Sequence, residues 1–489
     1  MGVVIKQGVR ASLITYFGVI FGALNFLYIM PKILEPDQIG MIRLLQDLAI
    51  LLASFVQFSL PTVLDRFIPV FRKEGVSSIR FALIYPLPFA GIFLFIFAMN
   101  PDFWSALLIP DNPEMQPYFL LVPLLMVILI GQLMMESFYR ANLKIAFPNF
   151  IKEVFVRMTQ TLLVVGLALK LFGFETIMLG IVVAYGLGAI LLFAYAHFKG
   201  WLDWRGSVFP QKEKQKEIAH YAWFVLLSSA GALVASKVDT LMISSMVGLD
   251  ALGIYVIAFF IGSVIEIPRR AISQIAIPLI SKAFKEGEIE AIRKLYRQTA
   301  GVLIVVGSWL FLGIWCNLDF VYDVMPNAEI YRTGAMVMFW IGMSKVVDMV
   351  FGLNSEIILQ SDQYRKLTYF TASLAVLLVL TNLWLIPIYG ISGAAFATFL
   401  SMMIFNLLKL ILILRVWGIQ PFGMGHLYFI PFIVLPYIII QSLPEFNMWG
   451  EFLVRGIIIT LSVYFGAVIS GVSEDLQQLN KRILTSFSN

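Results

Sequence analysis

Long apolar runs recur along this chain from end to end, and many of them reach 18 residues or more. A run of that length crosses the hydrocarbon core of a bilayer as an α-helix. The runs are continuous rather than alternating, whereas a membrane β-barrel would show weaker segments of about ten residues. Only 13% of the residues are charged, compared with about a quarter in a soluble domain. The sequence therefore predicts an all-α integral membrane protein.

About 14 transmembrane helices are predicted, and proline or glycine marks many of their ends. Their expected limits are 11–33, 44–64, 80–99, 117–139, 149–171, 176–198, 219–246, 252–271, 298–316, 331–353, 367–387, 392–415, 425–442 and 451–470.

A weak internal repeat indicates an ancient duplication. Gly40 in LEPDQIG corresponds to Gly253 in LDALG, and FRKEG ending at Gly75 corresponds to FKEG ending at Gly287. The copies lie about 210 residues apart, which is the size of a half-transporter. Because each copy holds an even number of spans, both enter the membrane in the same direction, and the repeat is parallel.

The repeat and a polar stretch between its copies predict the domain organisation. We expect an N-lobe of six spans over 1–200 and a cytoplasmic linker over 201–218, where the sequence is rich in charge. A C-lobe of six spans follows over 219–416. Two extra spans and a cytoplasmic tail occupy 417–489 and lie outside the repeat.

The basic residues predict the orientation in the membrane. With both termini in the cytoplasm, 28 of the 35 Lys and Arg residues fall on the cytoplasmic side or at the adjoining helix ends. This is the bias that sets topology in multi-pass proteins. The exceptions are Lys32, Arg43, Lys170, Arg332 and Arg455 on the outer side, and Lys237 and Lys345 inside the membrane.

No catalytic constellation is present in the sequence. It has no glycine-rich phosphate loop, nucleotide motif or Ser/His/Asp arrangement, and an enzyme is not expected. Its three histidines are scattered, so no metal site and no cofactor are predicted. The net charge is +5, and the basic residues lie mostly in short loops between spans, where they set the orientation of the protein in the membrane. No nucleic-acid partner is therefore expected.

Ionisable residues inside apolar spans are costly unless they meet a partner or a water-filled cavity. Lys237 and Asp239 are two residues apart in one expected span, so they point to different faces and do not pair with each other. Lys345 and Asp348 are three apart and can pair locally. Two interpretations remain for each set: a structural charge pair, or a cavity charge that meets an anionic substrate or a coupling ion.

Charged residues nearer the helix ends add weaker candidates. Two acids have an arginine four residues on, in Glu136–Arg140 and Glu153–Arg157, and each pair can form within its helix. The substrate-binding candidates are Lys237, Lys345, Arg66, Arg269 and Arg270, and the ion-coupling or charge-pair candidates are Asp239, Asp348, Glu136 and Asp47.

Three stretches resemble the polysaccharide biosynthesis (O-antigen flippase) family. They are DTLMISSMVG from Asp239 to Gly248 followed by LGIY, PIYGISGAA from Pro387 to Ala395, and the first span followed by PKILEPDQIG. The resemblance covers essentially the whole chain. Its motifs are shared by the wider superfamily of multidrug, oligosaccharidyl-lipid and polysaccharide exporters.

The resemblance implies two six-helix lobes in a V around a central cavity, with alternating access. It implies a flippase that moves a polyprenyl-pyrophosphate-linked oligosaccharide across the bacterial inner membrane for surface polysaccharide biosynthesis. Lys237 best matches a positive cavity position that holds the pyrophosphate. The implied partners are the lipid-linked oligosaccharide, membrane lipid, and a polysaccharide polymerase or glycosyltransferases.

Other functions stay open at this point. An ion-coupled multidrug exporter of the same fold needs an acid-dominated cavity, and the two mid-membrane lysines argue against it. A peptidoglycan-precursor flippase also has two extra spans, but the first span here carries only Lys32 rather than an arginine-rich cavity. A non-transporting scaffold for a polymerase is the remaining class. Because no ATP site is present, an ion gradient, the membrane potential or product removal would drive uphill transport.

Overall fold

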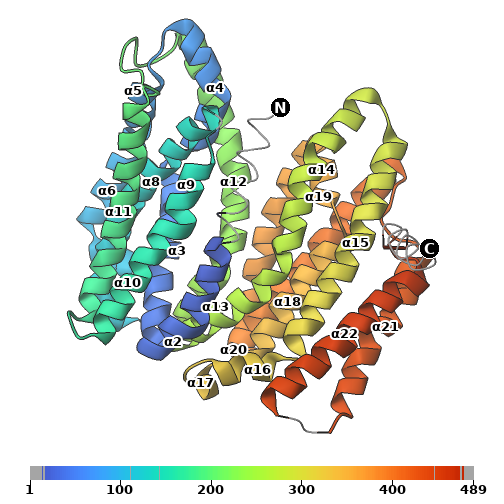
Figure 1. Ribbon diagram of the computed structural model, residues 1–489. Helices are drawn as coiled ribbons and strands as arrows, with labels where there is room; N and C mark the ends of the chain where they lie inside the picture. The colour runs from blue at the N-terminus through green and yellow to red at the C-terminus, as the bar shows by residue number, and fades with distance from the viewer. Residues whose placement is uncertain are drawn as a thin grey trace. The chain divides into compact units, whose positions relative to one another are not determined.

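Figure 1 shows the computed structural model, which describes residues 14, 17–110, 112–142, 144–444, 447–473 and 476–477. The contacts divide the chain into two units, Met1–Gly253 and Ile254–Asn489. Every element in the described residues is a helix, apart from one isolated bridge between Val76 and Ser207. The all-α class is therefore confirmed, while the expected lobe and linker limits remain predictions.

The first unit is built from helices that run back and forth (Figure 1). They are η1 (Asn25–Ile29), α2 (Met30–Ile33), α3 (Pro36–Val56), α4 (Leu60–Glu74), α5 (Ser78–Ile84), α6 (Leu87–Met99), α7 (Pro101–Leu108), η2 (Pro113–Tyr118), α8 (Leu121–Ala141), α9 (Ala146–Phe150), η3 (Ile151–Phe155), α10 (Val156–Ala168), α11 (Phe174–Phe198) and α12 (Lys212–Met246).

The chain enters the second unit through α13 (Leu249–Ser263). The remaining elements are η4 (Val264–Glu266), α14 (Ile267–Glu286), α15 (Ile289–Trp315), α16 (Leu318–Val324), α17 (Ala328–Arg332), α18 (Ala335–Val350), α19 (Asn354–Gln360), α20 (Tyr364–Trp417), α21 (Met424–Gln441) and α22 (Met448–Ser470).

Ten helices of the described chain are long and apolar enough to cross a membrane, or eleven if α18 and α19 form one span bent by 51°. The protein is thus a multi-pass membrane protein, but the expected number of 14 spans is not confirmed. One cause is that α20 joins two expected spans in a single stretch of 54 residues. Its backbone breaks at Gly390, where φ is 57° and ψ is −136°, a conformation that glycine adopts readily.

Two further expected spans differ for local reasons. The span at 149–171 is built from three short pieces, α9, η3 and α10, so no single helix there is long enough. The span at 11–33 lies partly outside the described residues, and its described part is the shorter apolar helix Phe17–Ile33.

In the first unit, α8 is the central helix and packs against α3, α4 and α11. Its buried face includes Met135 and Tyr139, which join Phe67 and Phe71 of α4 in one apolar cluster. The Tyr139 hydroxyl donates to the carbonyl oxygen of Leu192 at 2.9 Å, so the aromatic side chain is buried without losing a hydrogen bond. This packing fixes the inner faces of α3, α8 and α11 toward one another.

In the second unit, α18 packs against α15 and α20. The last two helices, α21 and α22, pack against each other and also contact α15. Close approach is possible at Gly466 of α22, where an added Cβ would lie 2.4 Å from Cβ of Phe432 on α21. The Trp309 indole of α15 donates to Oγ1 of Thr460 at 3.1 Å and ties α22 to α15.

Gly40 and Gly253, which correspond in the sequence repeat, each pack against the backbone of the other's helix start. A Cβ at Gly40 of α3 would lie 2.2 Å from the carbonyl oxygen of Leu249, and a Cβ at Gly253 of α13 would lie 1.9 Å from that of Pro36. Because those distances are far below contact distance, only glycine fits at either position. Pro36 and Leu249 are also equivalent in the repeat, so the starts of α3 and α13 meet at equivalent points of the two copies.

Candidate functional site

A polar cavity of about 210 Å³ lies within the first unit, lined by η1, α3, α8, η3, α10, α11 and α12. Both η1 and η3 are π-helical, a wider turn that is frequent at functional sites. The charged residues in its lining are Arg43, Asp47, Glu136, Lys152, Glu153, Arg157 and Lys237. Four cations thus face three carboxylates inside a bundle of apolar helices.

Asp47 is the hub of this cavity and is only 3% exposed. Lys237 Nζ on α12 lies 2.5 Å from Asp47 Oδ1 on α3. Arg43 Nε lies 2.7 Å from Asp47 Oδ2, and the Thr240 hydroxyl donates to the same oxygen at 2.9 Å. The Asp47 carboxylate therefore balances part of the positive charge of Lys237 and Arg43, and it links α3 to α12. Such partners are needed because a buried charge without them strongly destabilises a fold.

Two predicted pairs within helices are confirmed. Glu153 lies 2.8 Å from Arg157, and Glu136 lies 3.6 Å from Arg140. Arg140 also reaches Asp65 of α4 at 3.0 Å, which draws it away from the cavity.

Two neutral polar side chains complete the cavity wall. The Gln132 amide donates to the carbonyl oxygen of Tyr185 at 2.7 Å. The buried Oδ1 of Asn25 has no hydrogen-bond partner among the described residues. An unsatisfied buried acceptor is a position where water, a proton donor or a cation can bind.

The size and charge of the cavity limit what it can hold. Pockets that bury drug-sized ligands measure about 300–1,000 Å³, so this cavity is too small for an oligosaccharide. It suits a phosphate-sized anion or an ion with water. Lys152 makes no ion pair within the described part of the chain and adds positive charge to the cavity lining. The lining therefore combines an excess of one positive charge with a carboxylate that is shared by two cations.

A second group of buried charges lies in the second unit. Arg269 of α14 is 3.0 Å from Asp348 of α18 and 3.5 Å from Glu356 of α19. The Ser273 hydroxyl of α14 donates a hydrogen bond to the carboxylate of Glu356. Lys345 pairs instead with Glu266 of η4 at 2.7 Å.

These contacts correct the prediction that Lys345 and Asp348 pair with each other. Residues three apart on a helix lie on neighbouring faces, and each of these side chains meets a closer partner on another element. The bent connection between α18 and α19 places Glu356 beside Arg269, which no helical spacing could indicate.

Lys409 of α20 is a buried charge that the sequence did not single out as a site residue. It is 0% exposed, its Nζ donates to Ser355 Oγ at 2.8 Å, and it lies 4.0 Å from the ring centre of Phe405. It also interacts electrostatically with Asp348, Arg269 and Glu356. Its position inside an apolar run is the signal that could have identified it, whereas the distribution of basic residues groups it with the cytoplasmic helix ends.

The five predicted substrate-binding cations do not form one group. Lys237 lines the cavity of the first unit, while Lys345 and Arg269 belong to the cluster of the second unit.

The other two candidate cations lie at the surface. Arg270 is largely exposed and pairs with Glu266 at 3.0 Å. Arg66 lies at the surface of α4, 4.4 Å from the ring centre of Tyr221, and is not part of the cavity lining.

The acidic candidates separate in the same way. Asp47 and Glu136 line the cavity of the first unit, and Asp348 joins the cluster of the second. Asp239, two residues from Lys237, is partly buried but is not among the residues that line the cavity. The sequence does not identify Arg43, Lys152 or Glu356 as site residues, because the faces they occupy depend on how the helices rotate in the bundle.

Comparisons with known proteins agree with this fold. Residues 5–284 match the family model described as "Polysaccharide biosynthesis protein". A curated relative, the "Probable flippase AglR" of Haloferax volcanii, is 26% identical over 200 residues, which are 39% of this chain. The matched segment spans only 40% of that relative's length.

Two solved structures share the fold. The "Lipid II flippase MurJ" in its inward closed conformation matches with a TM-score of 0.73 and 12% identity, over 94% of this chain and 98% of that one. An inward-facing "multidrug resistance MATE family transporter of the MOP superfamily" matches with a TM-score of 0.64 and 13% identity, over 84% and 98%. Since the family model covers more than half of the residues, the chain belongs to the polysaccharide biosynthesis protein family.

Proposed function

We propose that this protein is a flippase that moves a polyprenyl-pyrophosphate-linked oligosaccharide across a membrane by alternating access, without covalent chemistry. The observation that carries the proposal is the contact of Asp47 with Lys237 and Arg43 inside a polar cavity of a membrane-spanning bundle. A sugar–pyrophosphate headgroup cannot cross hydrocarbon unaided, because charged and polar groups lose their hydration there. Buried cations offer such a headgroup a favourable site.

The pairing of Asp47 suggests how binding is controlled. With Asp47 ionised, Lys237 and Arg43 are held by the carboxylate and are not available to an anion. A pyrophosphate, with two or more negative charges, competes for both cations. Protonation of Asp47 releases them in the same way. Binding of the headgroup is thereby linked to the charge of one carboxylate, which can use a proton gradient as the driving force.

The balance of charges in the cavity favours an anionic substrate over a cationic drug. The lining carries four cations against three carboxylates. The relatives support a lipid-linked substrate, since one is named a probable flippase and another a lipid II flippase. Peptidoglycan precursor remains a second candidate substrate because the fold matches the lipid II flippase over almost its whole length.

The same proposal includes the cellular setting. We place the protein in a bacterial inner membrane with both termini in the cytoplasm, on the distribution of Lys and Arg. A cysteine at Glu329, which is exposed in α17, should react with an impermeant thiol reagent added outside intact cells. Reaction only after the cells are opened would reverse the orientation.

The decisive experiment is a headgroup-flipping assay in proteoliposomes. A pyrophosphate-linked prenyl oligosaccharide is offered to wild type, Lys237→Ala, Asp47→Asn and the exposed control Lys366→Ala. We expect flipping by wild type and by the control, and loss in Lys237→Ala. Arms with lipid II and with a cationic dye distinguish the two other transport functions.

Each outcome has a defined meaning. Flipping that persists in Lys237→Ala keeps the transport function and assigns Lys237 a structural role. Movement of lipid II alone would change the substrate. Dye efflux without headgroup flipping would replace this proposal with drug export.

A further inference from the structure

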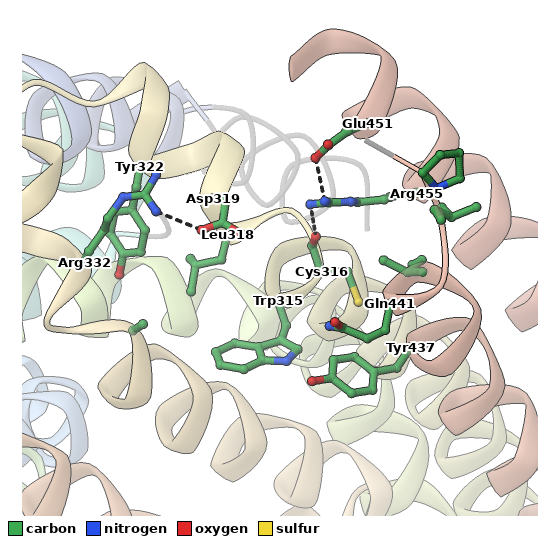
Figure 2. A pocket seen from close by; sticks show the side chains of 14 residues that line it. Trp315, Cys316, Leu318, Asp319, Tyr322, Arg332, Tyr437, Gln441, Glu451 and Arg455 are labelled. Carbon is green, nitrogen blue, oxygen red and sulfur yellow. Dashed lines mark hydrogen bonds and ion pairs between the residues drawn. The ribbon is translucent and has the colours of Figure 1, made fainter. Parts of the chain in front are cut away.

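A larger pocket lies in the second unit, away from the buried charge cluster described above. It measures about 480 Å³ and is formed where the end of α15 meets α16, α17, the end of α21 and the start of α22. Figure 2 shows it from close by, with one ion pair on either side of the view and Trp315 between them. Its size falls within the about 300–1,000 Å³ of small-molecule pockets.

The charges of this pocket are neutralised by one another. Arg332 Nη1 lies 3.0 Å from Asp319 Oδ1, and Arg332 also contacts Asp323. On the other side, Arg455 lies 2.5 Å from Glu451. The pocket lining therefore has two guanidinium groups and two carboxylates, with no net charge. This balance disfavours an anion such as pyrophosphate and also a cation.

The guanidinium group of Arg455 and the helix that carries it are held in place by contacts within the protein. Arg455 donates a second hydrogen bond to the carbonyl oxygen of Cys316 at 3.0 Å, which ties α22 to the end of α15. The Phe320 ring of α16 stacks on Phe452 of α22 with centres 4.4 Å apart. A preorganised site loses little conformational entropy when a ligand binds.

The remaining lining supplies aromatic faces and uncharged hydrogen-bonding groups. Trp315 and Tyr437 provide the rings, and Gln441 provides an amide beside them (Figure 2). Tyr322 is 2% exposed, and its hydroxyl has no hydrogen-bond partner among the described residues. Burial raises the pKa of Tyr322 to about 12, so this hydroxyl remains a donor. A buried donor without a partner is costly until a ligand or water satisfies it.

We infer that this pocket is a carbohydrate-binding site for one or two uncharged sugar units. A sugar ring presents hydroxyl groups that both donate and accept, and carboxylate, amide and guanidinium groups with fixed orientation satisfy them in pairs. Its apolar C–H face packs on an aromatic ring. An apolar lipid tail would leave all these polar groups unsatisfied, and that argues against a tail as the occupant.

The inference rests on the proposed function only in naming the source of the sugar, which is the glycan headgroup of the transported lipid. The site is separate from the pyrophosphate-sized cavity of the first unit.

The test uses the purified full-length chain and ligand-observed saturation-transfer NMR. The probes are galactose, N-acetylglucosamine and cellobiose, with glucuronate as the charged comparison. We expect saturation transfer to at least one uncharged sugar and a weaker signal from glucuronate. Tyr322→Phe, which removes only the hydroxyl, should weaken binding about tenfold, the effect of one buried hydrogen bond.

A pair of matched variants controls for folding. Trp315→Leu should abolish saturation transfer, whereas Trp384→Leu, at an exposed position of α20 outside the pocket lining, should retain it. If Trp315→Leu does not fold, Tyr322→Phe and Gln441→Met carry the test. No transfer to any uncharged sugar, equal loss in both tryptophan variants, or preference for glucuronate would overturn the inference. The probes lack a lipid carrier, so this test and the flipping assay can fail separately. Sugar binding without headgroup flipping would overturn the proposed transport function alone. Headgroup flipping without sugar binding would overturn the carbohydrate site alone.

Discussion

Lys237 Nζ on α12 lies 2.5 Å from Asp47 Oδ1 on α3, although the two residues are 190 positions apart in the sequence. The contact is nearly buried, with the Asp47 side chain 4% and the Lys237 side chain 17% exposed. It therefore joins the first and last long helices of the cavity wall by a charge pair that water screens little.

The two partners of this pair should respond unequally to neutralisation. Asp47→Asn leaves both Lys237 and Arg43 without their carboxylate, whereas Lys237→Met leaves Asp47 with Arg43 and Thr240. We expect Asp47→Asn to lower stability by about 3–5 kcal/mol and Lys237→Met by clearly less. Thermal unfolding of the purified variants measures the order. The double variant should be more stable than Asp47→Asn alone, and equal losses in the two single variants would contradict a shared carboxylate.

The buried Lys409 should be stabilised by the acids around it. Lys409→Met leaves Arg269 alone to balance Asp348 and Glu356, so we expect a loss of about 3–5 kcal/mol in a thermal unfolding series. Adding Glu356→Gln to Lys409→Met restores neutrality and should recover part of the loss. If the second change only adds to the first, the group is not coupled.

The reciprocal packing of Gly40 and Gly253 predicts that both are intolerant of a side chain. An added Cβ would lie 2.2 Å and 1.9 Å from backbone oxygens, which no side-chain rotation relieves. We expect Gly40→Ala and Gly253→Ala to reduce the yield of folded protein in membranes strongly. Gly131→Ala of α8 is the matched control, since nothing lies within 4 Å of its added Cβ and alanine favours a helix by about 1 kcal/mol. A normal yield of folded protein for Gly40→Ala or Gly253→Ala would show that the starts of α3 and α13 do not meet in this way.

The single cysteine, Cys316, should react slowly with thiol reagents. It is 8% exposed, and burial raises its pKa to about 11, above the ordinary value for a thiol. Burial disfavours the thiolate, so the rate with 4,4′-dithiodipyridine should rise about tenfold per pH unit from pH 7 through pH 9.5 without levelling. Glu329→Cys in a Cys316→Ser background is the exposed comparison and should level near pH 8.5. A plateau for Cys316 at that pH would mean that its thiol is open to water.

Contacts that depend on spacing within one helix could be predicted from the sequence. Glu153–Arg157 is an example, and the glycine break at Gly390 within PIYGISGAA is another, because both depend on near neighbours. The prediction failed where the partner came from elsewhere in the chain. Lys345 pairs with Glu266 rather than with Asp348. Asp47 was a candidate from the sequence, but its partner Lys237 comes from a helix 190 positions away.

The sequence by itself determined that this chain is an all-α membrane protein, since long apolar runs have few other stable arrangements in a bilayer. Its motifs also determined its family. Only the tertiary structure decided which charges meet, because the rotation of each helix about its axis is set by packing against its neighbours rather than by its own pattern. For that reason the partners of Asp47, the buried Lys409 and the pocket beside Trp315 became visible only once the helices were placed together.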